Sequence, residues 1–152
     1  MHVKVYNGVD EFATAQGDVL GTTEWVVVDQ ARIDTFAQAT GDHQWIHVDA
    51  VKAASGPFGA TIAHGLLTLS LLPVLLHELY KVDAVTMAVN YGFDKVRFAA
   101  PVPVGSRVRA SAVVGAVDKV PGGVQGKIAV TIEVEGSAKP AAVAESIVRF
   151  VA

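Results

Sequence analysis

The segment of residues 64–80 constrains the fold more than any other part of the 152-residue chain. It reads HGLLTLSLLPVLLHELY, and a helix with this spacing is apolar on nearly all sides. A bilayer span needs about 20 mostly apolar residues, whereas this run is shorter and is interrupted by Thr68, Ser70 and Pro73. An apolar helix that does not span a membrane is buried inside a fold. We therefore expect a central helix over about residues 64–80, bent where Pro73 lacks an amide hydrogen.

Strand patterns dominate the second half of the chain. Apolar and polar residues alternate with the period of two that is typical of a strand exposed on one face. Consecutive strands joined by short turns pair antiparallel. The sequence thus predicts one α+β domain over residues 1–152, in which the buried helix covers an antiparallel sheet. The predicted strands are residues 85–91, 107–112, 128–134 and 143–151, with turns at residues 121–123 and 136–140.

The first half favours short elements. Residues 22–28, TTEWVVV, are rich in β-branched side chains and indicate a strand. Asp29 can cap the helix that follows, and Gly41 can end it. A second helical turn is predicted to start at Asp49 and to stop at residues 55–57, SGP. One face of the first helix carries Ile33, Phe36, Ala37 and Thr40.

Composition excludes several classes of function. Twelve Lys and Arg against fifteen Asp and Glu give a net charge of −3, so the chain has no positive field for nucleic acid. The absence of cysteine excludes a disulfide scaffold, a thiol enzyme and an iron–sulfur site. Hydrophobic residues make up 51% of the chain, and we expect part of this surface to be covered by a partner subunit or an apolar ligand. The N-terminal residues do not match a signal peptide, which favours the cytoplasm.

Polar and aromatic side chains are densest in residues 40–49, TGDHQWIHVD. Asp42 and His47 bracket two apolar residues, and a carboxyl group beside an imidazole in apolar surroundings suits general acid–base catalysis. In the alternative interpretation, Asp42 caps a turn and His47 bonds to a backbone carbonyl group. The spacing alone leaves both interpretations open.

A metal site at the same segment is the weaker hypothesis. His43 and His47 are four residues apart and could lie on one helix face. Zinc needs a third ligand, and the zinc protease motif carries glutamate where this chain has Gln44. We therefore expect no metal.

The run TIAHG of residues 61–65 precedes the apolar part of the buried helix. Gly65 falls in the first turn, where backbone N–H groups have no partner within the helix and carry partial positive charge. Such an N–H group can stabilise an oxyanion. Alternatively, Gly65 only permits close packing and His64 only caps the helix.

Together these motifs resemble the MaoC-type (R)-specific enoyl-CoA hydratases, and most of all the branch that includes NodN-like proteins. The resemblance covers about residues 20–150. It implies a hot-dog fold, in which an antiparallel β-sheet wraps around a long central helix, and a homodimer whose sheets join edge to edge. It is carried by residues 40–49, 56–59 (GPFG), 61–65, 90–98 (NYGFDKVRF) and 101–105 (PVPVG).

The resemblance also implies an activity that needs no cofactor. Members of the family add water reversibly, in syn fashion, to trans-2-enoyl-CoA and form (R)-3-hydroxyacyl-CoA. By similarity, Asp42 and His47 would be catalytic and would share one water molecule. The backbone N–H of Gly65 would bind the thioester oxygen, and His64 and Asn90 would complete the substrate-binding site.

The chain departs from some family members at Pro73, where they carry a hydroxyl residue that orients the aspartate. Thr68, Ser70 and Asn90 are candidate substitutes. Two rival functions stay open: a hot-dog acyl-CoA thioesterase, and a partner subunit that binds acyl-CoA without catalysis. The first would attack the carbonyl carbon, and the second would usually lack the aspartate or the histidine.

Overall fold

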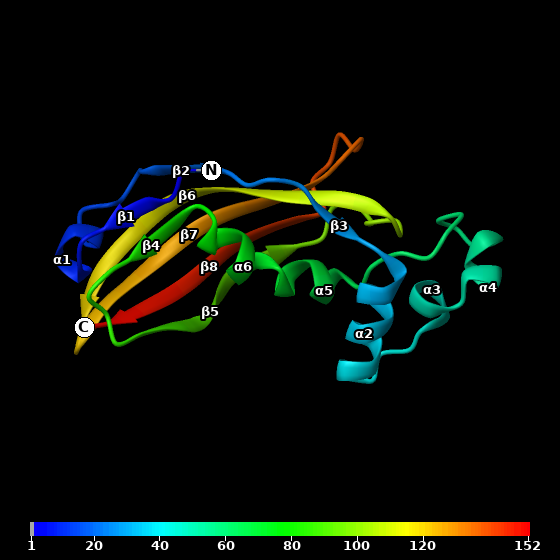
Figure 1. Ribbon diagram of the computed structural model, residues 1–152, viewed down its shortest axis with the longest axis horizontal. Coiled ribbons are helices and arrows are strands. Elements are labelled where there is room, and N and C mark those ends of the chain that lie inside the picture. Colours follow the sequence, from blue (N-terminus) through cyan, green and yellow to red (C-terminus); the bar gives the residue numbers. More distant parts are fainter. Residues whose placement is uncertain (1) are drawn as a thin grey trace.

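An antiparallel sheet curls around two short helices placed end to end in the computed structural model, which describes residues 2–152 (Figure 1). The main sheet has the order β2-β6-β7-β8-β5, with β3 also paired to β6. The strands are β1 (Lys4–Tyr6), β2 (Val19–Thr22), β3 (Val26–Val28), β4 (Tyr80–Val82), β5 (Met87–Arg97), β6 (Ser106–Val120), β7 (Gly123–Val134) and β8 (Ala142–Val151). The helices are α1 (Val9–Phe12), α2 (Gln30–Thr40), α3 (Trp45–Val48), α4 (Ala50–Ala54), α5 (Gly65–Ser70) and α6 (Leu72–His77).

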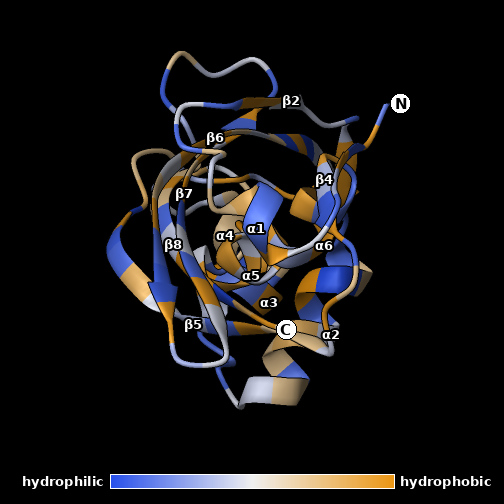
Figure 2. Ribbon diagram, turned by 90° about the vertical axis from the view of Figure 1, so that its left-hand side faces the viewer, coloured by the Kyte–Doolittle hydropathy of each residue, from blue (hydrophilic) through white to orange (hydrophobic). Residues whose placement is uncertain are grey.

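The predicted central helix is confirmed, as two helices rather than one. The axis is interrupted at Leu71, and Pro73 lies in the first turn of α6, where its missing amide hydrogen costs least. The second helix ends at His77, before the predicted end at residue 80, and Tyr80 instead begins β4. Both helices lie within the curl of the sheet, as an end-on view shows (Figure 2). No helix within residues 2–152 is long and apolar enough to cross a membrane.

The antiparallel meander is confirmed for β6, β7 and β8, in which each strand pairs with the next one along the chain. The first predicted strand of the meander lies elsewhere: β5 pairs with β8 at the edge of the sheet, with Asn90 opposite Val148. The long connection between β5 and β6 permits this position. Strands β1 and β4, a parallel pair of three residues each, were not predicted, because such short strands show no clear alternation of apolar and polar residues.

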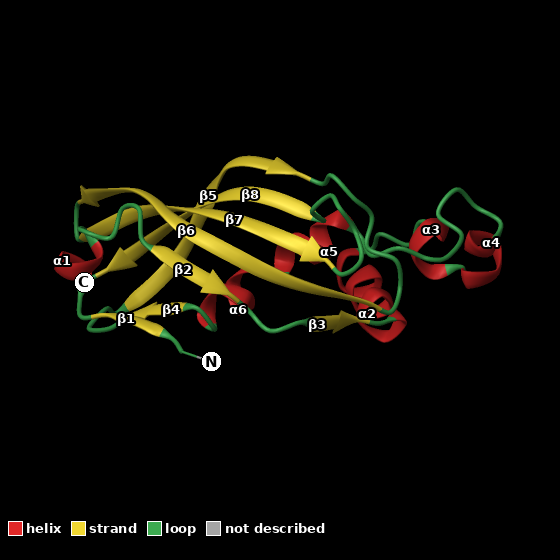
Figure 3. Ribbon diagram, turned by 90° about the horizontal axis from the view of Figure 1, so that it is seen from above, coloured by secondary structure: helices red, strands yellow, loops and turns green. Residues whose placement is uncertain are grey.

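The short helices of the first half begin and end as predicted. The side chain of Asp29 accepts a hydrogen bond from the N–H of Arg32 at 2.9 Å, and Gly41 closes α2 with a left-handed φ of 84°. Asp49 caps α4 in the same manner. Helix α3 was not predicted, since one turn is too short for a periodic pattern. Helices α3 and α4 project well beyond the end of the sheet (Figure 3).

The opposite end of the molecule is closed by an aromatic plug, formed by Tyr6, Phe12, Tyr80 and Phe150. The ring of Phe12 is fully buried and lies 5.2 Å from Tyr6, 6.0 Å from Tyr80 and 5.0 Å from Phe150 between ring centroids. Gly126 of β7 faces this ring, and a Cβ atom there would come within 2.7 Å of it. The glycine therefore lets the ring lie directly against the sheet.

Candidate active site

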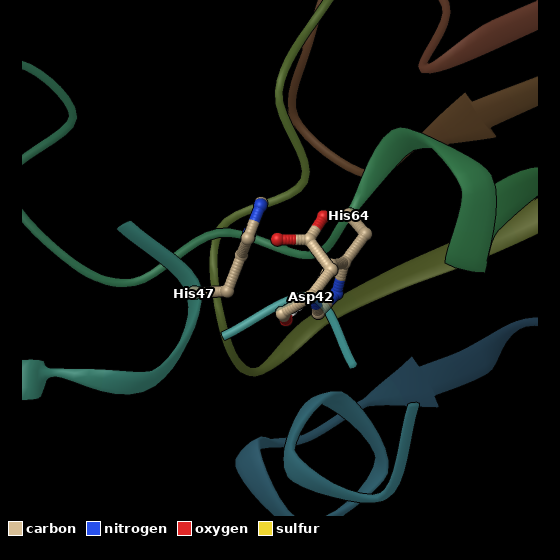
Figure 4. Close-up of side chains that lie close together, drawn as sticks. All are labelled: Asp42, His47 and His64. Carbon is tan, nitrogen blue, oxygen red and sulfur yellow. Dashed lines mark hydrogen bonds between the residues drawn. The ribbon is translucent and has the colours of Figure 1, made fainter. Parts of the chain in front are cut away.

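Three polar side chains from separate segments meet at the N-terminal end of α5. Asp42 comes from the loop after α2, His47 from α3, and His64 from the residue just before α5. One polar atom can be chosen from each side chain so that all three atoms lie within 4.8 Å of one another. Figure 4 shows the three side chains close together. His47 and His64 are only 6% and 2% exposed, whereas Asp42 is exposed. The predicted pair Asp42 and His47 is thus brought together.

Backbone contacts fix the ring of His47. Its Nδ1 lies 2.7 Å from the carbonyl oxygen of Ile62. Because a carbonyl oxygen only accepts hydrogen bonds, Nδ1 carries the hydrogen, and Nε2 of the neutral ring has a free lone pair. The N–H of Ile62 in turn donates to the carbonyl oxygen of Ile46 at 3.0 Å. Helix α3 therefore runs beside the segment that leads into α5.

The carboxyl group of Asp42 serves the local turn and remains available. Its Oδ1 accepts a long hydrogen bond of 3.4 Å from the N–H of Gln44, which precedes α3. The turn-capping interpretation of Asp42 and the carbonyl-bonding interpretation of His47 are therefore both observed. Each contact uses one polar atom of the side chain and leaves the other, Oδ2 or Nε2, for chemistry.

His64 precedes α5 at the capping position, but its side chain makes no capping hydrogen bond. Its Nε2 lies 3.0 Å from the carbonyl oxygen of Asp42 instead, 22 residues away in the sequence. Its ring stacks on that of His47 with centroids 3.8 Å apart and an interplanar angle of 21°. The ring therefore contacts the two predicted catalytic residues rather than open solvent.

Gln30 is a positioning side chain that the sequence analysis missed. Its Nε2 donates to the carbonyl oxygen of His47 at 2.9 Å, and its Oε1 accepts from the hydroxyl of Thr61 at 2.6 Å. One glutamine on α2 thus joins α3 to the segment that carries His64. A single glutamine near the start of a helix gives no signal in the sequence, because its partners lie 17 and 31 residues away.

Gly65 lies beside His47 in a shared cavity of about 390 Å³. As the first residue of α5, it has an N–H group without an acceptor in the helix. A Cβ atom at this position would lie 3.0 Å from the ring of Phe98, so the close-packing interpretation of the glycine also holds. Other residues that line the cavity include Ile46, Phe58, Thr68 and Ala141.

Asn90 lies apart from this cluster. It lines a second cavity of about 530 Å³ between α6 and the strands β5 and β8, together with Pro73. The two cavities have no lining residue in common. Among the other candidate substitutes for the missing hydroxyl, Ser70 donates to the carbonyl oxygen of Leu67, while Thr68 lines the cavity beside Gly65.

The same three side chains form the only group within residues 2–152 whose donor atoms are close enough for a metal ion. The donor set of one carboxylate and two imidazoles is chemically suitable for zinc. The arrangement of the two rings is unsuitable for zinc. Nitrogen lone pairs lie in the planes of the rings, and the two planes are stacked nearly parallel, so the lone pairs do not meet at one ion about 2 Å from each nitrogen. His43, the metal partner considered from the sequence, is exposed and outside the cluster.

Comparisons with known proteins identify the family of the chain. The family model described as MaoC like domain matches residues 11–137. The 3-hydroxyacyl-thioester dehydratase Z of Mycobacterium tuberculosis is 58% identical over 151 residues, with 99% of this chain and 100% of the relative covered. Nodulation protein N of Rhizobium meliloti is 44% identical, with 91% of this chain and 88% of the relative covered.

Solved structures support the fold. The (R)-hydratase of A. caviae that is involved in PHA biosynthesis superposes with a TM-score of 0.72 at 25% identity, covering 88% of this chain and 94% of that one. The hot-dog fold expected from the sequence is therefore confirmed. The chain belongs to the MaoC-like dehydratase family and is an enzyme of the hydro-lyase type.

Proposed function

We propose that the protein is an (R)-specific enoyl-CoA hydratase, which adds water reversibly to trans-2-enoyl-CoA and forms (R)-3-hydroxyacyl-CoA. The observation that carries this proposal is the meeting of Asp42 and His47 at the N-terminus of α5, with Gly65 in the same cavity as His47. The dehydratase name of the mycobacterial relative supports a 3-hydroxyacyl thioester as the substrate class.

In this mechanism one water molecule is held between Asp42 and His47. Nε2 of His47 is the base, because Nδ1 is already committed to the carbonyl oxygen of Ile62. The carboxylate of Asp42 accepts a hydrogen bond from the second O–H group of the water, which stays on the oxygen, and stabilises the imidazolium ion that forms when His47 takes the first hydrogen. The lone pair on oxygen is then aimed at C3 of the enoyl group.

Attack on C3 moves the double-bond electrons towards the thioester oxygen. The N–H of Gly65 donates a hydrogen bond to this oxygen and stabilises the enolate charge. The imidazolium ion of His47 returns its proton to C2, so that the elements of one water molecule are added and His47 is regenerated. Because one side chain serves both carbons, hydrogen and hydroxyl arrive on the same face, which gives syn addition.

The acyl chain of the substrate can continue along the buried rod, which consists of helices α5 and α6 placed end to end. Thr68 of α5 lines the cavity beside Gly65, while Leu72 and Leu76 of α6 line the cavity beside that helix. On the sheet, Ala141, just before β8, lines the first cavity, and Ser146 within β8 lines the second, so the two cavities follow each other in the direction of this strand. We propose that the acyl tail follows this path and that Asn90 contacts the tail rather than Asp42.

We propose further that two copies pair along β5. This edge strand of 11 residues pairs with β8 on one side and with no strand of residues 2–152 on the other, and it carries large exposed apolar side chains, among them Tyr91 at 56% and Phe93 at 43% exposure. Exposed edges of this kind promote association with another strand. Sedimentation should give a dimer that Phe93→Asp weakens, whereas Val19→Asp, on the opposite edge strand β2, should leave it intact.

The decisive test of the activity uses crotonyl-CoA. Hydration removes the enoyl-thioester absorbance without release of free thiol, and the product should be oxidised only by a dehydrogenase specific for (R)-3-hydroxyacyl-CoA. Release of thiol would identify a thioesterase instead. Binding of crotonyl-CoA with neither change would identify a non-catalytic subunit, and either result would overturn the proposal.

A further inference from the structure

We infer that His64 is a positioning residue that locks the loop of Asp42 against the segment leading into α5, an inference that rests on the proposed function. His64 is 2% exposed, so its ring does not reach solvent. Its Nε2 lies 3.0 Å from the carbonyl oxygen of Asp42. Since that oxygen can only accept, Nε2 carries the hydrogen of the neutral ring, and the bond holds the backbone of the residue that binds the water.

The two histidines form a reciprocal clasp, defined by the hydrogen bonds from His47 to Ile62 and from His64 to Asp42. An imidazole from residues 42–47 donates a hydrogen bond to the backbone of residues 62–64, and an imidazole from residues 62–64 donates one to the backbone of residues 42–47. Neither bond alone fixes both segments. Together they set the position of the Asp42 carboxyl group relative to the amide of Gly65, which is the geometry that the reaction needs.

Two neighbouring rings, one stacked and one tilted, hold the plane of the His64 ring. One neighbour is His47, at a centroid distance of 3.8 Å, and another is Phe36 of α2, at 4.8 Å. A ring that packs against both Phe36 of α2 and the imidazole of His47 has little freedom to turn away from the carbonyl oxygen of Asp42. Movement of His64 would therefore disturb both members of the proposed catalytic pair.

The remaining nitrogen of His64 shows why a neutral ring suits this position. Nδ1 is buried and has no hydrogen-bond partner within residues 2–152. A proton on Nδ1 would create a buried charge directly beside His47, where the mechanism forms an imidazolium ion. The neutral ring instead offers its face to that ion, an arrangement in which aromatic faces attract cations.

Two substitutions of similar size separate positioning from packing. In His64→Gln the amide nitrogen reaches the place of Nε2 and can donate to Asp42, whereas in His64→Asn it ends near the place of Nδ1 and cannot. Misplaced groups can cost about 100-fold in rate, so we expect this loss of kcat on crotonyl-CoA for His64→Asn. We expect His64→Gln to keep kcat within about tenfold of the parent and KM to change little in both variants.

Equal kcat for the two variants, or losses that follow the fall in Tm, would reduce His64 to a packing residue and overturn the inference. A second measurement needs neither variants nor activity. Long-range ¹H–¹⁵N NMR of the parent should show hydrogen on Nε2 of His64 and on Nδ1 of His47. Hydrogen on Nδ1 of His64 would overturn the inference even if the protein hydrates crotonyl-CoA, and the expected pattern would uphold the clasp even if it does not.

Discussion

The two ends of the buried rod are held in different ways. At the start of α5, directional hydrogen bonds run from the rings of His47 and His64 to the backbone carbonyl oxygens of Ile62 and Asp42. Beyond the end of α6, the aromatic plug around Phe12 closes the fold by ring packing. The first end fixes polar atoms in position, and the second buries large side chains without specifying any reacting atom.

This difference predicts that activity and stability can be changed separately. Chemistry needs a water molecule and an oxyanion placed within fractions of an ångström, which hydrogen bonds can provide. Stability comes mainly from apolar area removed from water, which the plug and the leucines of the rod provide. Substitutions at the start of α5 should therefore lower kcat with little change in unfolding free energy, and substitutions in the plug should do the reverse.

The largest effect is expected at the hydrogen-bonded end. Asp42→Asn and His47→Ala should each lower kcat on crotonyl-CoA by about 10²–10⁴-fold, the usual contribution of a general acid or base. Because both groups act on one water molecule, the double variant should lose far less than the product of the single losses. Thermal unfolding of Asp42→Asn should stay close to that of the parent.

Two outcomes would contradict this profile. Activity of Asp42→Asn within a few-fold of the parent would leave Asp42 as a turn cap alone. Multiplicative losses in the double variant would place Asp42 and His47 in separate steps.

The aromatic end should show the reverse behaviour. Phe12 is fully buried against three rings, and truncation of such a phenylalanine to alanine costs about 3–5 kcal/mol. Urea unfolding of Phe12→Ala should give a loss of this size, while kcat measured where the variant is folded should not change. The control is Val19→Ala, which removes a side chain that is 72% exposed and should leave the unfolding free energy nearly constant. A loss of kcat in folded Phe12→Ala would mean that the two ends are coupled.

The sequence predicted the rod better than it predicted either of its ends. The leucine-rich run indicated that residues 64–80 are buried, and the alternation of apolar and polar residues indicated β6, β7 and β8. The motif residues Asp42 and His47 could be named because they are close in sequence. Gln30 and the plug could not be found, because their contacts join segments that are far apart in the chain. Asn90 was assigned from its place in a motif, which gave no information on the cavity that it lines.

A smaller effect is expected from the link between α2 and the site. Thr61→Val keeps the shape of a buried side chain but removes the hydroxyl that donates to Gln30. We expect a loss of about 1 kcal/mol in unfolding free energy, together with a fall in kcat of roughly tenfold through the loosened position of His47.

The matched control for this link is Gln125→Ala. Gln125 of β7 also makes one hydrogen bond between side chains, from Arg149 at 2.8 Å, but it lies on the sheet, away from the site. A similar loss of stability with unchanged kcat is expected there. If kcat fell equally in both variants, the effect of Thr61→Val would reflect general destabilisation.

The smallest effect concerns Tyr80 in the plug at alkaline pH. Burial raises the pKa of Tyr80 above its usual value, so the folded state binds the phenol proton more tightly than the unfolded state does. A raised pKa contributes stability below the unfolded value of about 10 and loses it as the pH rises further. The unfolding free energy should therefore fall above this pH, and Tyr80→Phe should reduce the slope while kcat at neutral pH stays the same. An unchanged slope would show that the hydroxyl of Tyr80 ionises as readily in the folded plug as in the unfolded chain, so that the aromatic end would not be closed to water.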